Sequence, residues 1–212
     1  MDTRLTDLPS RELVERLASR DPVPGGGSAA AVAGAIGAAL VGMVVELTVG
    51  RPDAADHEAL LDDVRAAAQR LRAELLDLAE TDAEAYDAVV RARRLPRETE
   101  PEVEARTNAM TEATREATRI PLATAAAAAA VLELADQIAP IGNRNAISDV
   151  GVGAMLAAAA VRGAALNVRI NVPYLAEDDP LAADASAELD RLLARADEGE
   201  RRVAAIVADR MG

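Results

Sequence analysis

Cysteine, phenylalanine and tryptophan are absent from this sequence of 212 residues, and its aromatic residues are Tyr86 and Tyr174. The absence of cysteine excludes disulfides and thiolate metal ligands. Because 50% of the residues are nevertheless hydrophobic, the core must be built from alanine, leucine, valine and isoleucine. Such small side chains predict helices that pack closely together.

Strand patterns are also lacking, since no segment alternates polar and apolar residues convincingly. Alanine, the strongest helix former, is abundant instead. We therefore expect an all-α fold in which residues 1–212 form a single domain, a bundle of about six or seven helices with Ala/Gly-rich helices at its centre. Several of these helices should be long.

Basic residues are outnumbered, since 36 Asp and Glu residues against 23 Lys and Arg residues give a net charge of -13. This balance argues against nucleic acid and anionic membranes as partners, because both require a basic face. The lone His57 lies between Asp56 and Glu58 and suits a solvated surface, and no cluster of ligands supports a metal site. The charged start MDTRLTDLPSREL lacks the apolar core of a signal peptide, so a cytoplasmic location is the default expectation.

The stretch from Pro22 to Gly50 organises the rest of the chain. Gly25, Gly26 and Gly27 allow a sharp turn, and Ser28 suits the N-cap of the helix that follows. The free N–H groups of such a helix start can hold an anion. A tight turn with a cap needs no ligand, and on these residues alone it is the favoured interpretation.

Small residues recur every fourth position in the following helix, at Ala30, Gly34, Ala38 and Gly42. This stripe predicts very close contact with a neighbouring helix. The run is long enough to span a bilayer. We expect a buried helix instead, because no second run of this kind is evident and alanine and glycine contribute little transfer free energy.

A long helix is predicted from Asp53, its expected N-cap, to about Arg93. Asp82 occupies a core position of its heptad pattern, and Tyr86 lies one turn further on nearly the same face. A buried carboxylate costs free energy unless it is paired or hydrogen-bonded. Asp82 is therefore either a functional group or a residue near the helix end that pairs with an arginine.

Four other elements complete the sequence-based expectations. A first helix is predicted over residues 10–19 with Ser10 as N-cap, a kink or break at Pro121, and a closing amphipathic helix from Pro180 to about Arg210. A second polar turn precedes another small-residue helix, and two asparagines lie near the end of that helix. These polar residues are Asn143, Asn145, Ser148, Asp149, Asn167 and Asn171. Capping and turn formation are their alternative roles.

Four motifs occur in order: PVPGGGSAAA, DAEAYDAVV, GNRNAISDVGVGA and ALNVRIN. Together they resemble the cyclodeaminase/cyclohydrolase family, which includes methenyltetrahydrofolate cyclohydrolases and the C-terminal domain of formimidoyltransferase-cyclodeaminase. The resemblance extends from about Leu8 to the final helix. It implies an all-α homodimer with a folate-binding cleft, acting on a one-carbon unit between N5 and N10 of tetrahydrofolate without a metal or separate cofactor.

The resemblance also implies a set of site residues. Asp82 and Asp149 would place a carboxylate beside the substrate's positive charge and supply a base for water, in an order left open, and Tyr86 or Ser28 would relay a proton. The implied substrate-binding residues are Gly25, Gly26, Gly27, Asn143, Asn145, Ser148, Asn167 and Asn171.

Two segments depart from the family pattern. Basic and aromatic residues for the folate glutamate tail are expected after Gly50, where the chain has Arg51-Pro52-Asp53, and Glu46 interrupts the apolar run. The favoured activity is hydrolysis of 5,10-methenyltetrahydrofolate to 10-formyltetrahydrofolate, because 212 residues leave no room for a transferase domain. Ammonia release from 5-formimidoyltetrahydrofolate is the alternative. A non-catalytic dimer that binds a folate-like ligand or a protein partner is a third possibility.

Overall fold

The computed structural model describes residues 4–212, which form helices and connecting turns without a strand. The elements in order are η1 (Leu5–Asp7), α1 (Ser10–Leu17), α2 (Gly26–Glu46), η2 (Pro52–His57), α3 (Glu58–Arg93), α4 (Glu100–Ile138), η3 (Arg144–Ala146), α5 (Ile147–Asn171), η4 (Val172–Tyr174) and α6 (Pro180–Met211). The all-α prediction, with several long helices, is confirmed.

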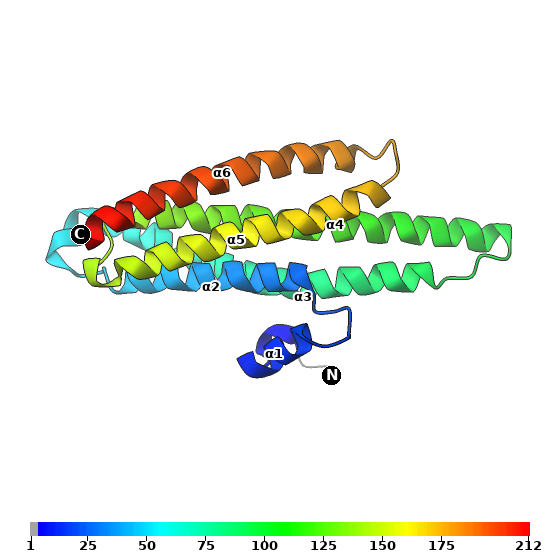
Figure 1. Ribbon diagram of the computed structural model, residues 1–212, viewed down its shortest axis with the longest axis horizontal. Helices are drawn as coiled ribbons and strands as arrows, with labels where there is room; N and C mark the ends of the chain where they lie inside the picture. Colours follow the sequence, from blue (N-terminus) through cyan, green and yellow to red (C-terminus); the bar gives the residue numbers. More distant parts are fainter. Residues whose placement is uncertain (1–3) are drawn as a thin grey trace.

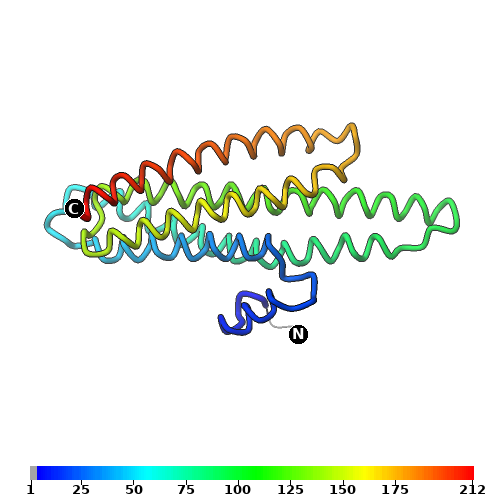
Figure 2. The backbone as a smooth tube through the Cα atoms, in the orientation of Figure 1, coloured from blue at the N-terminus to red at the C-terminus, as the bar shows by residue number. Residues whose placement is uncertain are grey.

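The long helices α2, α3, α4, α5 and α6 run along the length of the molecule, whereas the short α1 lies to one side (Figure 1). Successive helices from α2 to α5 reverse direction, and the hairpin of α3 and α4 extends beyond the ends of α2 and α5 (Figure 2). Contacts are most extensive between α2 and α5, between α2 and α3, and between α4 and α5. The start of α2 therefore lies beside the end of α5.

The core is built from small residues, as predicted. A Cβ atom on Gly37 of α2 would lie 2.8 Å from the backbone oxygen of Gly153 in α5, so the two backbones are in contact. A Cβ on Gly34 would lie 3.2 Å from Leu75 of α3 and 3.3 Å from Ala160 of α5. The small-residue stripe thus lets α2 pack closely against two helices at once.

Three predicted helix starts are wrong. Helix α2 begins at Gly26 with Gly25 as N-cap, so Ser28 lies inside the first turn and does not cap it. Ser10 is the first residue of α1, whose N-cap is Pro9. Asp53 pairs with Arg51 within the turn η2, and α3 starts later, at Glu58. In the first and third cases a side chain expected to cap its own helix is bonded to another group.

The predicted interruption at Pro121 is not a break, because α4 continues from Glu100 to Ile138. Proline has no N–H, so the carbonyl of Ala117, four residues earlier, lacks its usual helical donor. The side-chain amide of Asn171 in α5 donates to this carbonyl at 2.6 Å. A neighbouring helix thereby satisfies the backbone group that Pro121 leaves free.

Three helices are long and apolar enough to cross a membrane by length and composition, namely α2, α4 and the segment Arg144–Tyr174 that contains α5. The expectation that the first apolar run has no counterpart is therefore wrong. In each case 56% of the most apolar window is buried inside the fold. These runs supply the contacts among α2, α4 and α5, and part of each stays uncovered.

The backbone contact between α2 and α5 predicts a strong difference between two glycine substitutions. Gly37→Ala should lower the free energy of unfolding by about 1–3 kcal/mol, because its Cβ would overlap a backbone atom. Gly42→Ala is the matched control. Its Cβ would lie 3.7 Å from Ala68, so it should be neutral or stabilising by about 0.5–1 kcal/mol. Urea unfolding of both variants measures the difference, and equal effects would contradict the assigned contact.

Candidate functional site

A pocket of ≈ 330 Å³ lies where the start of α2, the end of α5 and the hairpin of α3 and α4 meet. Its lining combines backbone, apolar side chains and a few polar groups. The lining residues are Pro22, Val23, Gly25, Gly26, Gly27, Asp82, Tyr86, Val89, Val90, Arg93, Met110, Thr114, Ala117, Asn167, Ile170, Asn171 and Tyr174. A concave site with few convergent polar groups is the usual form of a small-molecule site.

The carboxylate of Asp82 in α3 lies over the first turn of α2. A Cβ on Gly27 would lie 2.1–2.6 Å from the carboxylate atoms of Asp82, so only glycine leaves space for this group. The free N–H groups and positive end of the helix dipole favour an anion at this position. Asp82 thus lies where an N-cap side chain of α2 would lie, although it belongs to another helix.

Ser28 connects this carboxylate to the backbone of α3. Its hydroxyl lies 2.9 Å from the carbonyl of Ala79 and 3.0 Å from Oδ2 of Asp82. One hydroxyl hydrogen cannot serve both acceptors fully. When Ser28 donates to Ala79, its oxygen is free to accept from a protonated Asp82.

Burial raises the pKa of Asp82 above its ordinary value of 3.8, against the opposing effect of hydrogen bonds from the side chain and backbone of Ser28. No described residue forms an ion pair with Asp82, so the alternative role of an arginine partner is wrong. The carboxyl is therefore a mostly buried group without a cation.

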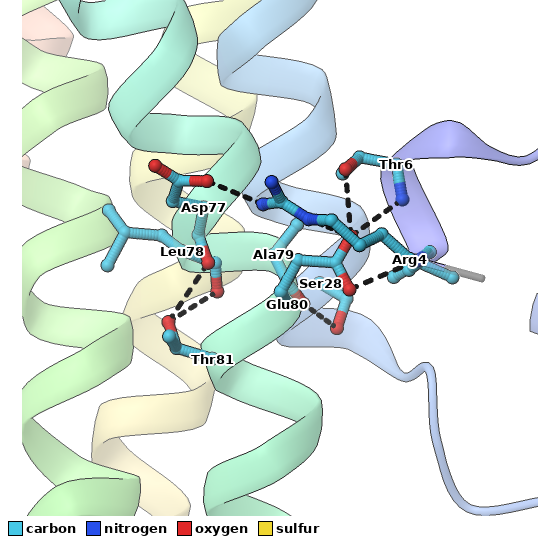
Figure 3. Close-up of polar contacts among 9 residues, drawn as sticks. Arg4, Thr6, Ser28, Asp77, Leu78, Ala79, Glu80 and Thr81 are labelled. Carbon is cyan, nitrogen blue, oxygen red and sulfur yellow. Dashed lines mark hydrogen bonds and ion pairs between the residues drawn. The ribbon is translucent and has the colours of Figure 1, made fainter. Parts of the chain in front are cut away.

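The turn of α3 that precedes Asp82 is fixed from outside the bundle. Glu80 accepts hydrogen bonds from the backbone N–H groups of Leu5 and Thr6 at 3.0 and 2.7 Å and from the Thr6 hydroxyl at 2.8 Å. Arg4 pairs with Asp77 at 2.5 Å on the same stretch. Figure 3 shows these contacts together with the bond from Ser28 to Ala79. They hold the N-terminal segment on α3 immediately beside the site.

Asn167 and Asn171 reach the pocket as predicted, but both side chains also have structural bonds. The amide of Asn167 donates to the carbonyl of Gly163 at 2.9 Å, and Asn171 donates to Ala117 at 2.6 Å. Each bond fixes the orientation of an amide that retains further polar groups. Tyr86 also lines the pocket, one turn beyond Asp82, and its ring is 43% exposed.

The second polar turn does not reach this pocket in the single chain. Asn143 donates to the carbonyl of Leu47 and accepts from Asn145, and its N–H bonds to Thr48 at the far end of α2. Ser148 and Asp149 follow in the first turn of α5. Since α2 has 21 residues, they lie about 30 Å from Asp82. The expectation of a common site is therefore wrong within one chain.

Several pocket residues were not predicted from the sequence, notably Arg93, Met110, Thr114 and Tyr174. Arg93 continues the face of Asp82 and Tyr86, so the helical spacing could have identified it. The other three lie on α4 and η4 and depend on tertiary packing. Among residues 4–212, no group of three or more His, Asp or Glu side chains is placed to hold a metal ion.

The raised pKa of Asp82 predicts a pH-dependent stability difference from Asp82→Asn. Folding favours the protonated carboxyl, so this contribution to stability is present at low pH and lost as the pH rises through the folded-state pKa. The asparagine variant should therefore gain stability relative to the wild type as the pH rises above about 4, the ordinary pKa of the carboxyl. Urea unfolding across this range measures it, and a constant difference would exclude Asp82 as the responsible group.

Known proteins resemble this chain over most of its length. The family model for formiminotransferase-cyclodeaminase matches residues 9–191. A methenyltetrahydrofolate cyclohydrolase from Methylorubrum extorquens is 41% identical over 190 residues, which cover 90% of this chain and 91% of that protein. The formimidoyltransferase-cyclodeaminase of Sus scrofa is 34% identical over 98% of this chain, which corresponds to 37% of the longer protein.

A solved structure agrees with these sequence matches. The crystal structure of a formiminotetrahydrofolate cyclodeaminase from Thermotoga maritima superposes with a TM-score of 0.85 at 27% identity, over 96% of this chain and 97% of that one. The order of motifs, the helical architecture and the sequence matches all indicate one family. The chain belongs to the formiminotransferase-cyclodeaminase family.

Proposed function

We propose that this protein is a methenyltetrahydrofolate cyclohydrolase, which opens 5,10-methenyltetrahydrofolate to 10-formyltetrahydrofolate with water. The observation that supports it most is the mostly buried Asp82 carboxyl, which faces the pocket without a cationic partner. The methenyl substrate carries its positive charge on the amidinium carbon between N5 and N10. The 41% identity to a cyclohydrolase over most of both chains supports the same reaction.

A cation beside Asp82 changes the chemistry of that carboxyl. The bound amidinium lowers the pKa of Asp82 and offsets the desolvation of the carboxylate. The first turn of α2 already supplies N–H groups on the other side of Asp82. Substrate binding and ionisation of Asp82 therefore support each other.

The reaction is balanced by proton transfers among water, substrate and protein. Water adds to the amidinium carbon and loses a proton to a base, which gives a neutral carbinolamine. The carbon–N5 bond then breaks as N5 takes up a proton and the hydroxyl loses one, which leaves a formyl group on N10. In the proposed mechanism Asp82 stabilises the cation or accepts the first proton, and Tyr86 delivers one. No metal and no separate cofactor takes part in the proposed reaction.

A second activity is favoured by the structural likeness to a formiminotetrahydrofolate cyclodeaminase. In that reaction N10 of 5-formimidoyltetrahydrofolate attacks the formimidoyl carbon, and ammonia leaves as the methenyl ring forms. Both reactions pass through a carbon bonded to N5 and N10, so one pocket suits both. Ammonia release from the formimidoyl substrate distinguishes the cyclodeaminase from a cyclohydrolase.

The proposed active form is a homodimer that pairs through α2 and α5. Apolar residues of both helices remain on an outer face next to their Gly37–Gly153 contact: Ile36, Leu40, Met43, Val152, Met155, Leu156, Ala159 and Leu166. Ile36, Met155 and Leu166 are 49%, 57% and 66% exposed. A chain with a net charge of -13 can pair with itself most easily through such an uncharged face.

A two-fold axis through this face would restore the site implied by the family motifs. Because α2 and α5 are antiparallel, a partner packed antiparallel on the same face brings the start of its α5 next to the pocket. Ile170 lines the pocket and extends the apolar face at 65% exposure. Asn143, Asn145, Ser148 and Asp149 of the partner subunit would then contribute to substrate binding and catalysis.

Removal of the Asp82 charge should lower turnover strongly without unfolding the protein. Asp82→Asn is expected to lower kcat for methenyltetrahydrofolate at least ~100-fold, which is the usual size of acid–base contributions. The matched control is Glu84→Gln, an exposed carboxylate on the same helix. Loss of the substrate's absorbance, corrected for spontaneous hydrolysis, gives the rate. Full activity in Asp82→Asn would remove Asp82 from the mechanism.

The proposed dimer predicts that a charge on its apolar face reduces both association and activity. Met155→Glu should elute as a monomer in sizing chromatography and lose at least about tenfold in activity, because the partner's Asp149 no longer reaches the pocket. Val103→Glu is the control, since Val103 is 48% exposed on α4 away from this face. A monomeric Met155→Glu with full activity would separate the dimer from the catalytic site.

A further inference from the structure

The pocket wall formed by α3 has opposite charges at its two ends. Asp82, Tyr86, Val89, Val90 and Arg93 line it, and their spacing places them on one face of the helix. Asp82 and Arg93 are 11 residues apart, which is about 16 Å along the helix axis. The pocket-lining residues between them, Tyr86, Val89 and Val90, are aromatic or apolar.

Asp82 and Arg93 are the charged members of the pocket lining. Arg93 is exposed at the last residue of α3, and no residue of the described range 4–212 forms an ion pair with it. Its backbone carbonyl accepts from the Arg106 guanidinium at 3.4 Å, which connects the end of α3 to α4. The Arg93 guanidinium therefore remains available to a ligand in the pocket.

We propose that Arg93 is the specificity-determining residue that binds the glutamate carboxylates of the folate substrate, on the basis of the proposed function. The substrate carries its positive charge at the one-carbon unit and its negative charges on the glutamate, with an aromatic ring between them. This order of charges is complementary to the pocket wall, in which the half-buried Asp82 lies at one end, Tyr86 and two valines in the middle, and the exposed Arg93 at the other end. Arginine can bind a carboxylate through two parallel N–H bonds.

The position of Arg93 also has a purely structural explanation, because a cation in the last turn of a helix interacts favourably with the helix dipole. Arg91 lies in the same last turn and lines a different groove, on the other side of the α3 and α4 hairpin. It provides the helix with the same charge without access to the substrate pocket. Arg91→Gln is therefore the matched control for Arg93→Gln.

The test compares two substrates, 5,10-methenyltetrahydrofolate and the carboxamide of 5,10-methenyltetrahydropteroate, which lacks the glutamate and carries no other carboxylate. For the folate, Arg93→Gln should raise KM about tenfold and leave kcat within about threefold, the size expected of a partly exposed charge-assisted contact. For the carboxamide, neither variant should change KM. Arg91→Gln should behave as the wild type on both substrates. An equal rise in KM for both substrates, or none for the folate, would overturn the assignment.

A binding measurement separates this inference from the proposed reaction. Calorimetry with 5-formyltetrahydrofolate, which needs no turnover, should show about tenfold weaker binding by Arg93→Gln than by the wild type or Arg91→Gln. If the wild type binds this ligand through Arg93 but hydrolyses no methenyl substrate, the inference stands and the proposed function is wrong. If methenyl substrate is hydrolysed but Arg93→Gln binds and reacts as the wild type does, Arg93 has no such role. Absence of both binding and turnover in the wild type would overturn both.

Discussion

The backbones of α2 and α5 touch where Gly37 and Gly153 face each other. Contact this close is possible because neither residue has a side chain, and it holds the two helices in one antiparallel register. Gly26 then lies beside Asn167 at one end, and Thr48 bonds to Asn143 at the other. The pocket depends on this register, because the start of α2 and the end of α5 form two of its walls.

A missing side chain at another glycine, Gly27, also makes room for the Asp82 carboxylate in the pocket. Gly27 lets the Asp82 carboxylate lie against the first turn of α2, and the hydroxyl of Ser28 at the next position lies within hydrogen-bond distance of this carboxylate and of the Ala79 carbonyl. The helix dipole favours the ionised form, but burial has the larger effect and raises the pKa of Asp82. Packing therefore leaves Asp82 as a mostly buried carboxyl that has hydrogen bonds but no cationic partner among the described residues. Such a group favours a cationic ligand, in agreement with the proposed substrate.

Much of this arrangement could be predicted from local patterns in the sequence. The four-residue repeat of alanine and glycine indicated the close helix packing, and the heptad pattern of α3 identified Asp82 as a carboxyl at a core position. Both features follow from the periodicity of residues along a single helix, which can be read from the sequence alone. The predicted cap at Ser28 was wrong because its hydroxyl bonds to residues 51 and 54 positions away in sequence, Ala79 and Asp82. A local rule for caps contains no information about such a partner.

To predict where the second polar turn lies relative to the first, one must know the direction of every helix between the two turns. Four antiparallel helices in succession put the starts of the first and the fourth at opposite ends, so α2 and α5 present their polar starts far apart. A break at Pro121 would have allowed an additional reversal of the chain direction, and the starts of α2 and α5 could then have lain at the same end. The helix continues through Pro121 because Asn171 supplies the missing donor to Ala117. One asparagine on α5 thus preserves the continuity of α4, and with it the antiparallel order that leaves Asn143 and Asp149 to a partner subunit on the proposed dimer.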